Sequence, residues 1–120
     1  MKNNRAIGNI YEKKAQSYIE KRGYNIIDTN YYGKHGELDI IAKKDTILVI
    51  IEVKYRKSLK YGSGLEAIDK KKMRRIYKTT KEYIYKKRIE NVDIRFDCIY
   101  FLDEKIFWIK NIAWGDEVGF

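Results

Sequence analysis

The chain has 120 residues, of which 44% are hydrophobic and 36% charged, so we expect a single domain over residues 1–120 with one core and a highly charged surface. No apolar stretch approaches the roughly 20 residues of a membrane span, and the N-terminus lacks the apolar core of a signal peptide. The single cysteine, Cys98, excludes an internal disulfide and a cysteine-based zinc cluster. We therefore expect a cytoplasmic protein without membrane association.

The net charge is +9, from 26 lysines and arginines against 17 acidic residues. A basic balance of this size indicates a polyanionic partner, most often nucleic acid or an anionic membrane surface. An AT-rich genome would also enrich lysine, together with asparagine, isoleucine and tyrosine. Charge alone therefore leaves both explanations open.

The first part of the chain predicts a helix followed by an edge strand. Apolar residues recur at helical spacing over residues 5–22, and Gly23 follows as a C-terminal cap. Residues 24–30 mix β-branched and aromatic side chains, which is typical of a short strand. We expect residues 31–35 to form a loop.

The remainder predicts four more strands and one long helix. Residues 37–42 and 47–55 are strands joined by a polar turn, and a loop with two glycines leads to a helix over residues 65–88. Residues 94–102 and 106–112 form a second hairpin. The order of helix, three strands, helix and two strands predicts an α/β fold with a mixed sheet and helices packed on it.

Charged residues end two strands that are otherwise apolar: Glu37, Asp39, Glu52 and Lys54. One hairpin register places Asp39 opposite Ile50, and a slip by two residues places it opposite Glu52. Because strand side chains alternate, both registers put the four charged residues on one face. The other face is expected to be uniformly apolar, with Leu38, Ile40 and Ala42 on the first strand and Ile47, Val49, Ile51 and Val53 on the second.

Burying unpaired charges costs several kcal/mol, so these residues need partners. Opposed Cβ atoms lie about 5 Å apart, within reach of one hard cation such as Mg²⁺ or Mn²⁺. A salt-bridged group of Asp39, Glu52 and Lys54 would satisfy the same charges. Both alternatives stay open from the residues alone.

The order Asp39, then Glu52-Val53-Lys54, resembles the PD-(D/E)XK nuclease-like superfamily, including nucleases of the Holliday junction resolvase type. A longer set of residues, spread over residues 8–114, resembles the small bacterial YraN-like family. That set comprises residues 36–41, residues 52–56, Tyr61-Gly62, Lys72 and Arg95-Phe96-Asp97.

The resemblance implies a three-layer restriction-endonuclease-like fold of order αβββαββ, with a mixed central sheet flanked by helices. It also implies that Asp39 and Glu52 are metal ligands and that Lys54 is the catalytic lysine. Glu12 would join the metal site from the first helix, although Tyr11 replaces a glycine of the family pattern, and a surface glutamate is the alternative.

Four cations are candidates for phosphate contact. Arg56 matches the family pattern, with a salt bridge at the rim as the alternative, and Lys72 is expected nearest to the active site. Lys71 and Arg75 begin the second helix, where a solvated charged face is the alternative reading. Glu37 is a candidate supporting partner for Lys54 or Arg56.

These expectations predict a metal-dependent endonuclease that hydrolyses DNA phosphodiester bonds, with branched or single-stranded DNA as candidate substrates and Mg²⁺ or Mn²⁺ as cofactor. The alternative is a catalytically silent nucleic-acid-binding module on the same fold. Cleavage of both strands would favour a homodimer. We expect Arg95 and Asp97 to form a buried ion pair and Cys98 to be a core residue.

Overall fold

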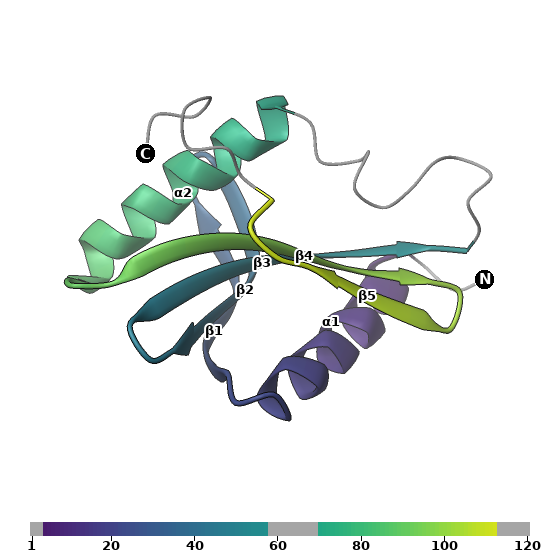
Figure 1. Ribbon diagram of the computed structural model, residues 1–120. Helices are drawn as coiled ribbons and strands as arrows, with labels where there is room; N and C mark the ends of the chain where they lie inside the picture. The colour runs from purple at the N-terminus through teal and green to yellow at the C-terminus, as the bar shows by residue number, and fades with distance from the viewer. Residues whose placement is uncertain (1–3, 58–69, 113–120) are drawn as a thin grey trace.

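The computed structural model describes residues 4–57 and 70–112 (Figure 1). The order of helices and strands is the expected one. The elements are α1 (Asn4–Glu20), β1 (Asn25–Gly33), β2 (Gly36–Lys44), β3 (Ile47–Arg56), α2 (Lys70–Lys87), β4 (Asp93–Leu102) and β5 (Lys105–Ile109). The expected glycine loop, the Tyr61-Gly62 pair and the predicted first turns of the second helix lie outside the described residues.

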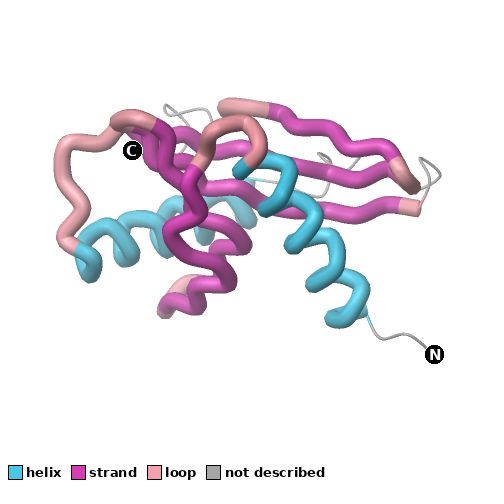
Figure 2. Tube along the Cα trace, turned by 90° about the horizontal axis from the view of Figure 1, so that it is seen from below, coloured by secondary structure: helices cyan, strands magenta, loops and turns pink. Residues whose placement is uncertain are grey.

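The five strands form one mixed sheet in the order β1-β2-β3-β4-β5. Only β3 and β4 run parallel, with α2 between them in the chain, and the other neighbours are antiparallel. The two helices cover opposite faces of the sheet (Figures 1 and 2). Each face therefore has its own apolar core, and the predicted α/β fold, with a mixed central sheet between two helical layers, is confirmed.

The end of α1 is fixed by the predicted glycine cap. Gly23 has a φ of 89°, a conformation that costs glycine little. Its N–H donates to the carbonyl of Glu20 at 3.1 Å, and the N–H of Tyr24 donates to the carbonyl of Ile19 at 3.2 Å. This pair of bonds is a Schellman motif, and it turns the chain directly into β1.

Strand β1 is longer than the sequence predicts, because residues 31–33 belong to it and not to a loop. Tyr31 supplies the reason: its hydroxyl donates to Glu82 of α2 at 2.8 Å, and its ring packs edge-on against Tyr83. The backbone N–H of Lys34 donates to the same carboxylate. These tertiary contacts extend the strand along α2.

Of the two hairpin registers, the one slipped by two residues is correct. Ile40 pairs with Ile51 and Lys44 with Ile47, so the turn consists of residues 45 and 46. Asp45 takes a positive φ of 54°, which aspartate tolerates in tight turns.

The prediction that Leu38 and Ile40 share an apolar face is wrong. Leu38 packs in the core under α2, whereas Ile40 packs in the core under α1. Asn30, which lies between the partners of these two residues on β1, has a φ of 50°. The alternation of side chains between the two faces is therefore interrupted at Asn30 in β1 and at Asp39 in β2. The direction of the Asp39 side chain consequently does not follow from simple alternation along β2.

A buried carboxylate ties the end of the sheet together. Asp97 is fully buried, and Arg95 donates to it through Nε at 3.0 Å and Nη2 at 2.8 Å, which confirms the predicted ion pair. Trp108 Nε1 and the backbone N–H of Asn111 also donate to Asp97, at 2.8 and 2.9 Å. Arg95 in turn donates to the hydroxyl of Tyr24. The network joins β4 to the chain after β5 and to the start of β1.

Cys98 is fully buried, as predicted, in the same strand. Burial raises the pKa of its thiol to about 12, so the side chain is a neutral core residue at physiological pH.

Candidate metal centre

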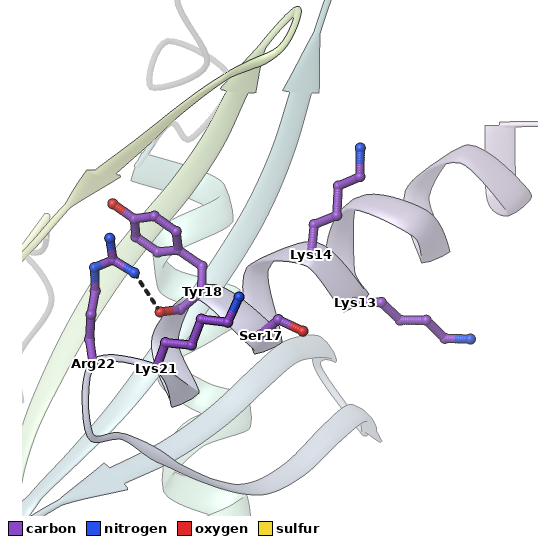
Figure 3. A pocket seen from close by; sticks show the side chains of 6 residues that line it. All are labelled: Lys13, Lys14, Ser17, Tyr18, Lys21 and Arg22. Atoms are coloured by element: carbon purple, nitrogen blue, oxygen red, sulfur yellow. Dashed lines mark hydrogen bonds between the residues drawn. The ribbon is translucent and has the colours of Figure 1, made fainter.

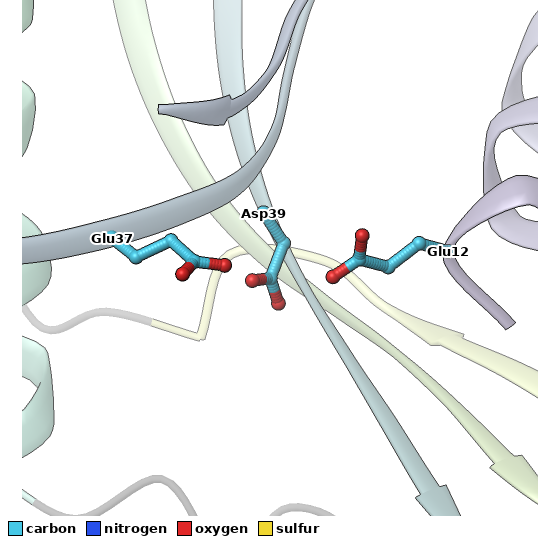
Figure 4. A group of neighbouring side chains, drawn as sticks. All are labelled: Glu12, Glu37 and Asp39. Carbon is cyan, nitrogen blue, oxygen red and sulfur yellow. The ribbon is translucent and has the colours of Figure 1, made fainter. Parts of the chain in front are cut away.

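Three carboxylates from two elements meet at one place: Glu12 of α1, and Glu37 and Asp39 of β2. One oxygen from each lies within 4.8 Å of the other two, and all three residues are half-buried. In Figure 4, Glu12 and Glu37 approach Asp39 from opposite sides. We call these three carboxylates the acidic group. The structure thus brings Glu12 close to Asp39, the residue with which the family resemblance implies that it would hold a metal.

The side chains of Asp39 and Glu52 each accept a backbone N–H from the strand that carries the other residue. Backbone pairing between β2 and β3 ends at Ile40 and Ile51. Beyond this pair, hydrogen bonds from side chains connect the two strands. Asp39 Oδ2 accepts the N–H of Val53 at 2.9 Å, and Glu52 Oε2 accepts the N–H of Asp39 at 3.3 Å. The two carboxylates therefore lie next to each other where the strands begin to separate.

The environment of Asp39 disfavours a negative charge. Burial raises the pKa of Asp39 to about 6, and the nearby carboxylates of Glu12 and Glu37 contribute to the rise, against the N–H of Val53 and the charge of Lys54. Burial likewise raises the pKa of Glu12, partly offset by a hydrogen bond from Asn30. Burial and mutual repulsion together disfavour full ionisation of the three carboxyl groups.

Glu52 is more strongly affected because only 3% of it is exposed. Burial raises its pKa to about 8, and the charge of Asp39 adds to the rise, while Lys72 and Lys54 oppose it. The pKa of Lys54 is lowered, first by burial and then by a hydrogen bond and charge repulsion from Lys72. Lys72 thus lies beside Lys54.

A family model described as the uncharacterised protein family UPF0102 matches residues 11–101. The chain belongs to this family. A UPF0102 protein of Fusobacterium nucleatum is 49% identical over 118 residues, covering 98% of this chain and 99% of the relative. A UPF0102 protein of Sulfurihydrogenibium sp. is 40% identical over 104 residues, covering 87% and 90%. One from Alkaliphilus metalliredigens is 40% identical over 110 residues, covering 89% and 96%.

The UPF0102 match confirms the expected YraN-like family and includes every residue of the acidic group. Neither described helix of this UPF0102 chain is long and apolar enough to cross a bilayer.

The remaining predicted phosphate contacts of this UPF0102 chain lie on β3 and α2. Arg56 is half-buried and its Nη1 donates to the carbonyl of Tyr55 at 2.8 Å, so part of its guanidinium is turned to its own strand. Lys71 and Arg75 are exposed on α2. A Cβ placed on Gly36 would lie 3.9 Å from the Cβ of Arg75, which puts Arg75 against the start of β2.

Asn30 is a site residue that the sequence reasoning missed. It occupies the point where β1 changes face, and its side chain is hydrogen-bonded to Glu12. The bond helps to hold Glu12 toward Asp39. Asparagine tolerates a positive φ better than most residues, and this property is the signal that the sequence offered.

We expect the metal-free protein to lose stability as the pH rises from 5 to 8. The folded-state pKa values of Asp39 and Glu52, about 6 and 8, lie above the ordinary values near 4, so the folded state binds more protons in this window. Stabilisation by these protons is complete below about pH 4 and is lost as the pH passes through the raised values. Thermal unfolding in EDTA measures the loss.

The variant Glu52→Gln isolates the contribution of Glu52, because glutamine keeps an oxygen that can accept the N–H of Asp39. Its melting temperature should change less than that of the wild type over the same pH range. If the melting temperatures of the two proteins changed with pH in parallel, this result would contradict the raised pKa of Glu52.

Proposed function

We propose that this UPF0102 protein is a metal-dependent endonuclease of the PD-(D/E)XK type that hydrolyses DNA phosphodiester bonds. One observation carries the proposal: Glu12, Glu37 and Asp39 converge beside the buried Glu52 and the half-buried Lys54. Buried, mutually repelling carboxylates destabilise a folded protein unless a cation neutralises them. Catalytic sites are where such arrangements are concentrated.

The donor set fits a hard divalent cation. Carboxylate oxygens are the ligands that Mg²⁺ and Mn²⁺ prefer, and we assign Asp39, Glu52 and Glu12 as the residues that would hold the ion. The nearby sulfur of Cys98 does not compete, since its raised pKa keeps it a thiol. A bound cation of this kind supplies Lewis acidity and lowers the pKa of a coordinated water.

Lys54 is assigned the catalytic role among the cations. Its lowered pKa leaves a larger fraction of the amine unprotonated at neutral pH, and thus able to accept a proton, than in an ordinary lysine. In its charged form the same group stabilises the negative charge that develops on the phosphate oxygens during in-line attack by water. Lys72, next to it, lowers the pKa of Lys54 and adds positive charge toward the phosphate.

The surrounding cations supply attraction for the DNA backbone. Lys71 and Arg75 are exposed on α2, and Arg56 follows Lys54 on β3. Contacts of this kind are made to phosphates and do not read the sequence. The proposal therefore includes steep salt dependence of DNA binding.

The direct test incubates purified protein with branched, flapped and single-stranded DNA in Mg²⁺ or Mn²⁺. We expect nicking with either metal and none in EDTA. Activity in EDTA, or no nicking of any of these substrates, would contradict the proposal.

A catalytically silent nucleic-acid-binding module is the second candidate, and one observation favours it. Asp39 and Glu52 each accept a backbone N–H from the other's strand, so the two acids also link β2 to β3. In that case the protein binds DNA in EDTA, nicks none of the substrates and binds no Mn²⁺ at sub-millimolar concentration.

A further inference from the structure

The outer surface of α1 carries a basic hollow of about 550 Å³. Figure 3 shows the side chains around it, and we call this surface the α1 groove. Its lining consists of Lys13, Lys14, Ser17, Tyr18, Lys21 and Arg22. Four of these six residues are cations and none is an acid, so the groove concentrates positive charge on the helix that also supplies Glu12.

One of the four cations is held in place. The guanidinium carbon of Arg22 lies 3.4 Å from the ring centre of Tyr18, and Arg22 Nη1 donates to the carbonyl of Tyr18 at 2.9 Å. The Nζ of Lys44 donates to the carbonyl of Arg22 at 3.3 Å, which fixes the backbone there. A cation that is ordered in advance loses less entropy when it binds an anion.

Within the part of the chain that the structure describes, the charges of the groove lysines are not paired with carboxylates. Over residues 4–57 and 70–112, no ion pair links Lys13, Lys14 or Lys21 to an acidic side chain. Glu12 lies on the side of α1 that meets the sheet, in the acidic group (Figure 4). The positive charge of the groove is therefore available to an external anion.

We propose that the α1 groove binds the phosphodiester backbone of a nucleic acid. Lys13 and Ser17 lie on α1, and Lys21 directly follows its last residue, where its N–H donates to the carbonyl of Ser17 at 3.1 Å and continues the helical spacing. The three residues therefore form a row about 12 Å long on one side of α1 and its end. Successive phosphates of one strand of a B-form duplex advance about 3.4 Å along its axis, so a row of this length can contact more than one phosphate. The Ser17 hydroxyl adds a neutral donor between the two lysines.

The composition of the groove favours nucleic acid over a membrane surface. Helices that lie on bilayers present an apolar face with large residues beside the cations, and the groove contains only Tyr18, whose ring is covered by Arg22. Cations spaced along one line match the successive phosphates of a strand better than a flat layer of lipid headgroups.

This inference rests on the proposed function only in taking nucleic acid as the ligand. It adds the α1 groove to the α2 cations as a second surface for that ligand. The α1 groove and the α2 cations Lys71 and Arg75 belong to helices on opposite faces of the sheet (Figure 1). A nucleic acid that reaches Asp39 from the α2 side would need to extend around the sheet to fill the groove as well. Binding through the groove requires neither the metal nor cleavage.

The test measures binding of a fluorescent DNA duplex by anisotropy in EDTA, at several salt concentrations. The variant Lys13→Gln/Lys14→Gln/Lys21→Gln removes three exposed charges, two on α1 and one directly after it, with a residue of similar helix propensity. We expect the slope of log K against log salt to fall by about 2.7, because each phosphate contact contributes about 0.9. Affinity at low salt should fall about tenfold or more.

The matched control, Lys43→Gln/Lys86→Gln/Lys105→Gln, removes three exposed lysines elsewhere. It should leave most of the slope intact. Equal losses in both variants, an unchanged slope in the groove variant, or no salt-dependent DNA binding by the wild type would each overturn the inference. So would a groove variant that loses binding only to vesicles containing anionic lipid. If the triple variant unfolds, Lys13→Gln/Lys21→Gln should lower the slope by about 1.8.

The binding assay contains no metal. Loss of DNA binding through the groove and absence of DNA nicking are therefore observed in separate experiments. A protein that binds DNA through the groove in EDTA and does not nick it in Mn²⁺ would support this inference and contradict the proposed cleavage.

Discussion

Replacing Lys54 with methionine should lower the rate of Mn²⁺-dependent DNA nicking by roughly 10²- to 10⁴-fold, the range associated with loss of one proton-transfer or charge-stabilising group. Methionine retains the length and apolar stem of lysine and removes only the amine. Loss of the amine removes the repulsion from Lys72 as well as the attraction to Glu52 and Asp39, and these two changes oppose each other. The fold should therefore survive, and thermal unfolding of the variant would show it.

Lys43→Met is the matched control, since Lys43 is exposed on the same sheet and lies outside the acidic group. It should nick DNA at nearly the wild-type rate. Glu52→Ala should be as inactive as Lys54→Met. Persistent nicking in both site variants would locate the activity elsewhere or in a contaminant.

Replacing Asp97 with alanine should reduce the free energy of unfolding by about 3–5 kcal/mol, the cost of leaving a buried ion pair broken. The substitution removes the acceptor for Arg95, for Trp108 Nε1 and for the N–H of Asn111. It also leaves a cavity at a fully buried position. Urea denaturation at neutral pH measures the difference.

Asp93→Ala provides the comparison on the same strand, because Asp93 is exposed at the start of β4. Its cost should stay within about 0.5 kcal/mol. A similar cost for the two variants would mean that the Asp97 network contributes no more than a surface carboxylate.

The sequence predicted the layers of the fold because each element carries a regular pattern. The helical spacing of Ala15 and Ile19 marks the buried side of α1, and Gly23 marks its end. The hairpin of β2 and β3 was limited to two registers by its charged residues, and the structure selects the second. These features depend on local periodicity, which a single sequence displays.

The departures arise from tertiary contacts. The extension of β1 depends on Tyr31 reaching Glu82, a residue 51 positions away in the chain. The change of face at Asn30 and Asp39 depends on two strands deforming together. Strand alternation therefore predicted that Asp39 lies near Glu52. It could not predict that the Asp39 side chain also lies close to Glu12.

Calorimetric titration of Mn²⁺ at pH 8 tests the central claim, that the acidic group holds a divalent cation. We expect wild-type protein to bind Mn²⁺ at sub-millimolar concentration. Asp39→Asn should bind at least about 100-fold more weakly, because the residue at the centre of the group loses its charge. Absence of binding by the wild type, or equal affinity in the variant, would contradict the claim.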